Sequence, residues 1–92
     1  MASTMNQMEE RLRRDFQPVH LRIIDESHKH FGHPGAVGGG GHFQVEIYSQ
    51  AFEGKTLLEQ HRLVNTSLRD LLGGEVHALG LSTGPASDWD KA

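Results

Sequence analysis

Apolar residues near the start of the chain recur every three or four positions, the spacing of one helix face. Four residues have this helical spacing: Met5, Met8, Leu12 and Phe16. Thr4 and Gln7 have the spacing of a capping box, in which two side chains satisfy free backbone N–H groups at a helix start. Pro18 cannot continue the helix because it has no N–H. The pattern predicts a helix over Thr4–Phe16.

Strict alternation marks the clearest strand, residues 42–49. Its apolar positions are Phe43, Val45 and Ile47, and polar side chains separate them. Because successive side chains of a strand point to opposite faces, this pattern predicts one buried face and one polar face. Residues 21–26 are predicted as a shorter strand, and residues 76–82 as a third, which Gly84 and Pro85 end.

The second long helix is predicted to open at Thr56, with Glu59 completing a capping box. Its apolar stripe comprises Leu57, His61, Val64, Leu68 and Leu71. Gly73 and Gly74 are expected to end it. Residues 86–92 are predicted to form a short helix that carries Trp89.

The element order is therefore helix, strand, strand, helix, strand, helix. At 92 residues the chain is expected to form a single domain over residues 1–92. We predict an α+β fold with a three-stranded mixed sheet and the two main helices on one face. The expected core is Phe43, Val45, Ile47, Leu57, Val64 and Leu68.

Residues 27–41 are predicted to be a loop between the first two strands. They contain one proline, six glycines and three histidines. Four consecutive glycines have high chain entropy and no side chain to pack. We therefore expect residues 28–41 to be flexible.

Charge and composition restrict the classes of function that the chain can have. The formal net charge is −3 with neutral histidines, which argues against binding nucleic acid through bulk charge. The chain has no cysteine, so any metal role depends on histidine, carboxylate or a partner's thiols. No apolar run has transmembrane length, and residues 1–10 do not have the pattern of a signal peptide. We expect a soluble, cytoplasmic protein that does not bind membranes.

Seven histidines stand out in so short a chain. The loop holds His28, His30 and His33, with His42 at its far end. Neutral imidazoles on a glycine-rich loop can bind a metal, but the spacing alone equally fits a solvated loop, because the usual cysteine partners are missing. His61 lies on an apolar stripe. This position favours a buried or half-buried imidazole that is hydrogen-bonded to the backbone or to a carboxylate.

His77 opens the third strand. By strand parity it shares a face with Leu79 and Leu81, yet its place at the strand end puts it at the rim of the sheet. Carboxylates at Asp25 and Glu26 have no evident acid partner, and the glycine run does not open a helix as a phosphate loop would. We therefore expect no enzyme activity.

Several segments together resemble the BolA family. They are Asp25-Glu26-Ser27 with His30, Gly41-His42-Phe43-x-Val45, Phe52-Glu53-Gly54-Lys55, His61-Arg62-Leu63-Val64, Val76-His77-Ala78-Leu79, and Pro85 with Trp89. The segments span nearly the whole chain in order. The resemblance implies a KH-like fold (class II) and a partner, a monothiol glutaredoxin of the CGFS type.

With that partner, the resemblance implies a heterodimer, with or without a bridging [2Fe-2S] cluster, that acts in iron-sulfur cluster trafficking or iron homeostasis. The glutaredoxin brings a cysteine and glutathione sulfur, and this chain brings His77 and a loop ligand, His30, with His33 as a rival. The isolated chain is expected to hold no cofactor and to be a monomer or weak homodimer.

Two alternatives stay open. One is a DNA-binding transcriptional regulator of the stress response, in which Lys55, His61 and Arg62 would make weak contacts. The other is a histidine-based module for zinc or copper.

Overall fold

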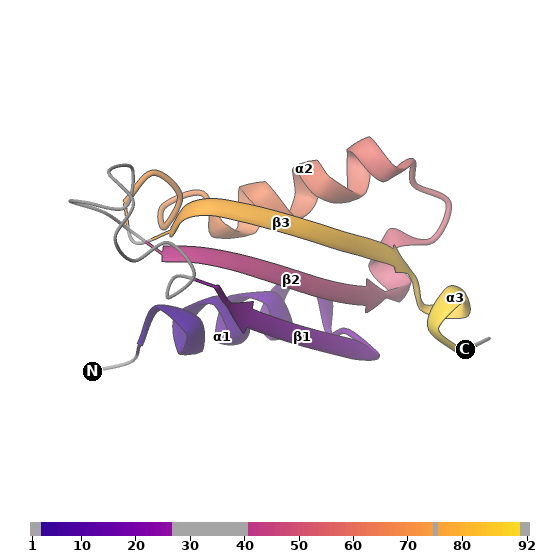
Figure 1. Ribbon diagram of the computed structural model, residues 1–92. Coiled ribbons are helices and arrows are strands. Elements are labelled where there is room, and N and C mark those ends of the chain that lie inside the picture. Colours follow the sequence, from indigo (N-terminus) through magenta and orange to yellow (C-terminus); the bar gives the residue numbers. More distant parts are fainter. Residues whose placement is uncertain (1–2, 27–40, 75, 91–92) are drawn as a thin grey trace.

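The expected order of elements is present in a computed structural model, which describes residues 3–26, 41–74 and 76–90 (Figure 1). The elements are α1 (Thr4–Phe16), β1 (His20–Asp25), β2 (Gly41–Ser49), the 3₁₀ turn η3 (Gln50–Phe52), α2 (Leu57–Leu68), β3 (Val76–Pro85) and α3 (Ala86–Asp90). Gly41, expected in the loop, begins β2. The rest of the predicted loop, with its expected flexibility, lies outside the described residues.

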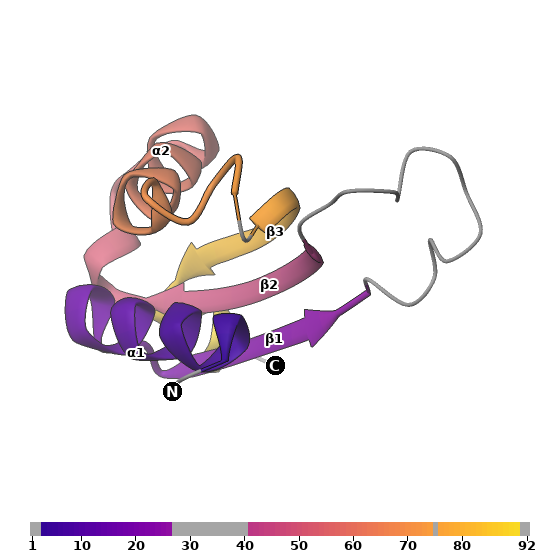
Figure 2. The ribbon, with the colours of Figure 1, turned by 90° about the vertical axis from the view of Figure 1, so that its left-hand side faces the viewer.

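The three strands form one sheet in the order β1-β2-β3. β1 pairs with β2 antiparallel, and β3 pairs with β2 parallel. Helices α1 and α2 lie on the same face of this sheet (Figure 2). The predicted α+β fold with a mixed sheet and two helices on one face is therefore confirmed.

The first helix begins at Thr4, but Thr4 is not its cap. Ser3 is the N-cap, and its hydroxyl accepts a hydrogen bond from the Asn6 N–H at 3.1 Å. The predicted capping box of Thr4 and Gln7 is wrong because Ser3 already provides the cap one residue earlier. At the other end Gln17 adopts a left-handed conformation, with φ 44°, that turns the chain toward β1.

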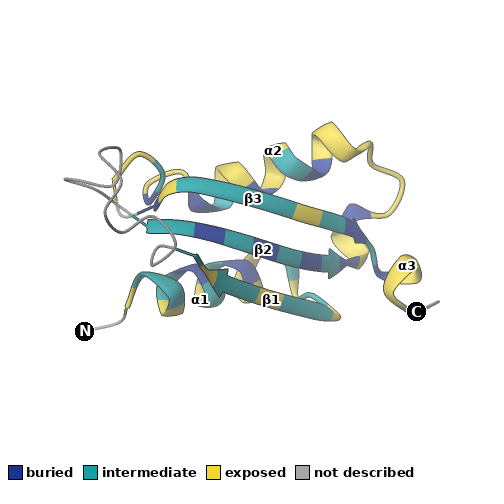
Figure 3. Ribbon diagram, viewed as in Figure 1, coloured by how far each residue is buried: buried dark blue, intermediate teal, exposed yellow. Residues whose placement is uncertain are grey.

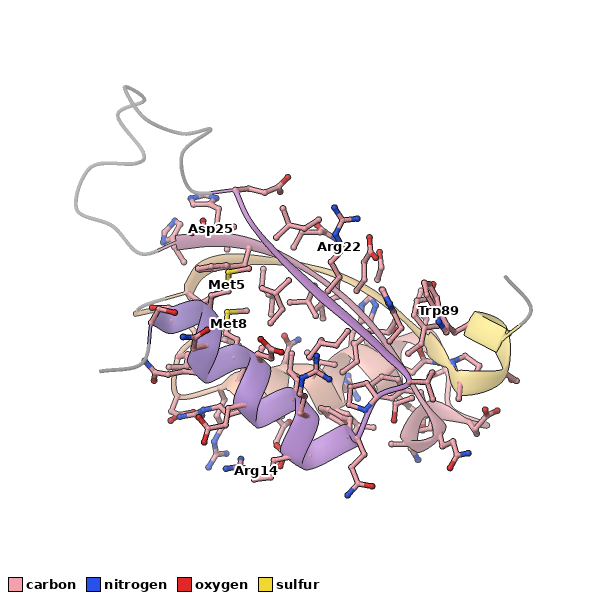
Figure 4. The ribbon with its side chains drawn as sticks, turned by 90° about the horizontal axis from the view of Figure 1, so that it is seen from below. Met5, Met8, Arg14, Arg22, Asp25 and Trp89 are labelled. Carbon is pink, nitrogen blue, oxygen red and sulfur yellow. The ribbon has the colours of Figure 1, made fainter. Side chains whose placement is uncertain are left out.

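The core lies between the two helices and the inner face of β2. Its buried members form one cluster: Met8, Leu12, Phe43, Val45, Ile47, Phe52, Val64, Leu68, Leu71 and Val76. Met5 and Met8 point from α1 toward the sheet, whereas Arg14 points away from it (Figure 4). Every predicted core residue is buried except one, Leu57.

Leu57 is 59% exposed, so its predicted core position is wrong. It lies in the first turn of α2, and the turn that follows meets the sheet through a polar residue. The side-chain oxygen of Gln60 accepts a hydrogen bond from the Thr83 hydroxyl at 2.7 Å, and its amide donates to the Lys55 carbonyl at 3.0 Å. The apolar stripe of α2 therefore begins at Val64, and the outer side of the helix is exposed along its length (Figure 3).

The capping box at the start of α2 is confirmed. Glu59 accepts from the Thr56 N–H at 2.8 Å, and the Thr56 hydroxyl accepts from the Glu59 N–H at 3.1 Å. The helix ends at Leu68, earlier than Gly73 and Gly74 would indicate. A turn follows, in which Leu71 stays in the core.

The third strand runs to Pro85, three residues beyond its predicted end. Gly84 allows this because the Tyr48 ring lies against it: an added Cβ would be 2.5 Å from Tyr48 Cε2. Pro85 is tolerated because it ends an edge strand, where a missing N–H costs no ladder bond.

Polar side chains also join the two helices. Both terminal guanidinium nitrogens of Arg11 donate to the carboxylate of Asp70, two residues beyond the end of α2, and the Ser67 hydroxyl donates to Asp15 at 2.6 Å. The bond from Arg11 lowers the pKa of Asp70 below its ordinary value. These contacts are exposed, so we expect the apolar core to contribute far more of the stability.

We predict that Val64→Asp strongly destabilises the chain whereas Leu57→Asp does not. Val64 is fully buried, and an unpaired carboxylate there costs several kcal/mol. Leu57→Asp places the same carboxylate in solvent near the α2 N-terminus, so its effect should stay within about 0.5 kcal/mol. Urea unfolding followed by circular dichroism measures both. Equal losses would show that Leu57 is a core residue after all.

Candidate functional site

The sheet has one face that α1 and α2 do not cover. Even-numbered residues of β2 point to it, and the strand pairing assigns its other members. From β1 to β3 they are His20, Arg22, Ile24, His42, Gln44, Glu46, Tyr48, Ala78, Gly80, Ser82 and Gly84. Arg22 lies on this side of the sheet, opposite α1 (Figure 4). We call this surface the open face.

A β-bulge decides where His77 lies. Gly41 pairs with Val76, but the next residue, His42, pairs with Ala78, so β3 has one extra residue at this point. Val76 is fully buried and His77 is exposed. The parity argument that placed His77 with Leu79 is therefore wrong, because a bulge interrupts the alternation of side chains. The rim position expected for His77 is observed.

The bulge brings His77 beside His42. Their ring centroids are 5.3 Å apart, and the rings are tilted by 46°. The carbonyl of His42 accepts a hydrogen bond from the Glu26 N–H at 2.7 Å, which joins the end of β1 to the start of β2. The two histidines thus come from neighbouring strands, far apart in the sequence, at one end of the open face.

Of the three predicted cluster ligands, the structure places only His77. His30 and His33 lie outside the described residues. The sequence analysis placed His42 at the end of the loop and the start of the strand, and in the family resemblance, but did not pair it with His77. Its even position in an alternating strand assigns it to the open face, but its proximity to His77 follows from the β2–β3 register.

The opposite end of the open face is covered by α3. Trp89 stacks on His20 with centroids 3.8 Å apart and planes 15° from parallel, and Tyr48 lies 5.5 Å from Trp89. His20 Nε2 is 3.2 Å from a carboxylate oxygen of Glu46. His20 is half-buried in this cluster.

His61 is half-buried on α2, as its stripe position predicts. Its Nε2 atom is buried and has no hydrogen-bond partner among the residues that the structure describes. The backbone or carboxylate partner expected for that nitrogen is therefore not found there. This geometry is that of a packing residue rather than a surface contact.

Two of the three proposed DNA contacts lie together. Lys55 and Arg62 line a shallow depression of about 250 Å³ on α2, with Glu59, Leu63 and Thr66. His61 does not line it. The pKa of Glu59 is lowered, first by its bonds to Thr56 and then by the two cations. The depression thus carries charges of both signs, with one carboxylate beside two basic residues.

The described part of the chain holds no group of three or more histidine, aspartate or glutamate side chains arranged for a metal ion. His42 and His77 supply two imidazoles, and any further ligands must come from elsewhere. Among the same residues, no helix is long and apolar enough to cross a membrane.

Comparison with known proteins agrees with this architecture. The family model for BolA-like proteins matches residues 12–87. The chain belongs to the BolA family. It is 46% identical over 83 residues to a BolA-like protein of Caenorhabditis elegans, covering 90% of this chain and 74% of the relative.

Other BolA relatives differ in name but match the same region. The DNA-binding transcriptional regulator BolA of Escherichia coli is 39% identical over 83 residues, covering 90% of this chain and 76% of the relative. The solved structure of BolA1 from Arabidopsis thaliana superposes with a TM-score of 0.82 at 37% identity, covering 96% of this chain and 97% of that one. The BolA fold is therefore shared over nearly the full length.

We predict that two substitutions at His61 differ in their effect on the free energy of unfolding. His61→Ala should lower the free energy of unfolding by about 1–3 kcal/mol because it leaves a cavity. His61→Leu should be neutral or stabilising, because it keeps the volume and removes a buried nitrogen without a partner. Thermal unfolding of both variants tests this. A large loss in His61→Leu would mean that the ring nitrogen makes a stabilising bond.

Proposed function

We propose that this BolA-family chain binds a monothiol glutaredoxin and shares a [2Fe-2S] cluster with it, in iron-sulfur cluster trafficking or iron homeostasis. The observation that supports this most is the position of His77. Its imidazole is exposed at the rim of the sheet, beside a second imidazole, at the end of the open face away from α3. A partner could reach it there without unfolding any described element.

The chemistry of the chain fits this role. With no cysteine, it can contribute only nitrogen or oxygen ligands to a cluster. The glutaredoxin cysteine and glutathione would supply the thiolates. Replacing two thiolates by imidazoles raises the reduction potential of a [2Fe-2S] centre, as in Rieske proteins. The shared cluster would thus differ in potential from one held by thiolates alone.

The second ligand of the proposed cluster site is His30, with His33 as its rival, on the family resemblance. Ordering a glycine-rich loop around a metal costs conformational entropy, whereas His77 is already held by the sheet. His77 is therefore the primary ligand in this proposal, and the loop histidine is the secondary one.

Reconstitution of the cluster tests this proposal. The chain is mixed with a monothiol glutaredoxin, glutathione, iron and sulfide, and the product is followed by visible absorption, circular dichroism and sizing. We predict a heterodimer with the spectrum of a histidine-ligated cluster. His77→Ala should abolish that spectrum or make the cluster labile while leaving the fold intact.

His20→Ala is the matched control. It removes an imidazole from the same face, about 20 Å away along β2 at 3.3 Å per residue. This variant should retain the cluster spectrum. If His77→Ala keeps the spectrum and lifetime of the wild-type heterodimer, the assignment of His77 is wrong.

DNA binding is the second candidate function. It is favoured by the depression on α2 that Lys55 and Arg62 line, and by the E. coli relative, which is named a DNA-binding transcriptional regulator. The net charge of −3 and the Glu59 carboxylate between these cations oppose tight binding. Binding to DNA would therefore be weak and mostly electrostatic.

A salt titration separates the two functions. If Lys55 and Arg62 contact phosphates, the logarithm of the binding constant should fall steeply with the logarithm of the salt concentration. The double variant Lys55→Ala/Arg62→Ala should reduce the magnitude of that slope by about two. Fluorescence anisotropy with a labelled duplex measures both. Tight, sequence-selective binding at physiological salt would favour the regulator over the cluster partner.

A further inference from the structure

The distance between the His42 and His77 rings fits a single metal ion. An imidazole nitrogen lies about 2.0–2.1 Å from zinc and about 1.1 Å from its own ring centroid, so two imidazoles on one tetrahedral ion have centroids about 5.2 Å apart. The observed centroid separation is 5.3 Å. The two rings therefore already lie at the centroid spacing that a shared ion requires.

This spacing is set by the sheet rather than by a mobile segment. His42 pairs with Ala78 in the β2–β3 ladder, and the bulge turns the side chain of the preceding residue, His77, to the surface. The buried side chain of Val76 holds the bulge in place from the core side. Because the two imidazoles are already positioned, binding an ion requires no ordering of a loop, and less affinity is lost to entropy.

We propose that His42 and His77 form a binding site for one divalent transition-metal ion in the chain without any partner. Imidazole suits zinc, nickel and copper ions, and water completes their coordination. This site does not depend on a glutaredoxin. It does use His77, so an ion bound here and a shared cluster compete for the same imidazole.

The test uses the full chain and zinc alone. Zinc is titrated by calorimetry, and the imidazole nitrogens are followed by NMR. The wild type should bind one ion, with shifts at both His42 and His77. A variant in which the loop histidines His28, His30 and His33 are alanine should bind with the same affinity, because the loop is not part of the site.

Single replacements in that loop variant identify the ligands. His42→Ala or His77→Ala should each weaken zinc binding by at least about tenfold, because two linked ligands bind an ion far more tightly than one. His20→Ala should leave the affinity unchanged. Backbone amide spectra confirm that each variant keeps its fold.

Two results would overturn this site. One is loss of zinc binding in the loop variant, which would assign the ion to the loop histidines. The other is an unchanged affinity in His42→Ala. Neither result bears on the glutaredoxin proposal, because cluster reconstitution with His77→Ala tests that separately.

Discussion

The alternation of side chains along β2 is the constraint on which the rest of the molecule depends. Val45 and Ile47 are fully buried against both helices, so they hold the central strand in one register. A slip of one residue would turn every side chain of β2 to the opposite face. The same burial therefore holds His42 at one end of the open face and Tyr48 at the other. Core packing thus positions the side chains of the open face.

The β-bulge extends this coupling to β3. Val76 must reach the core beside Gly41, and burying a valine contributes about 1.5–3 kcal/mol. The extra residue that follows, His77, then has no place in the regular ladder and lies at the surface. The position of the proposed ligand is therefore a consequence of hydrophobic burial at its neighbour, and its exposure carries no large cost because an imidazole is readily solvated.

Local signals predicted the features that local interactions decide. The bounds of α1, the capping box of Thr56 and the alternation of β2 all depend on residues that are close together in the sequence. One local prediction failed, the capping box of Thr4 and Gln7, because Ser3 caps α1. Other predictions failed where residues distant in the sequence decide. Leu57 is exposed because Gln60 meets Thr83, and the bulge and the His42–His77 contact depend on the pairing of β2 with β3. The family resemblance pointed to His77 as a candidate ligand, but it did not reveal His42 as its neighbour.

The two ends of the open face differ in the contacts of their side chains. At one end Trp89 stacks on His20, and the Glu53 carboxylate accepts a hydrogen bond from the Ser87 N–H at 3.2 Å. These contacts hold α3 over Tyr48. At the other end His42 and His77 present two nitrogen ligands on a chain without cysteine. One imidazole nitrogen cannot bind two metals at once. An ion held by this pair through the same nitrogen would therefore have to leave before His77 could join a cluster, so metal occupancy of the free chain would control whether His77 is available to a cluster.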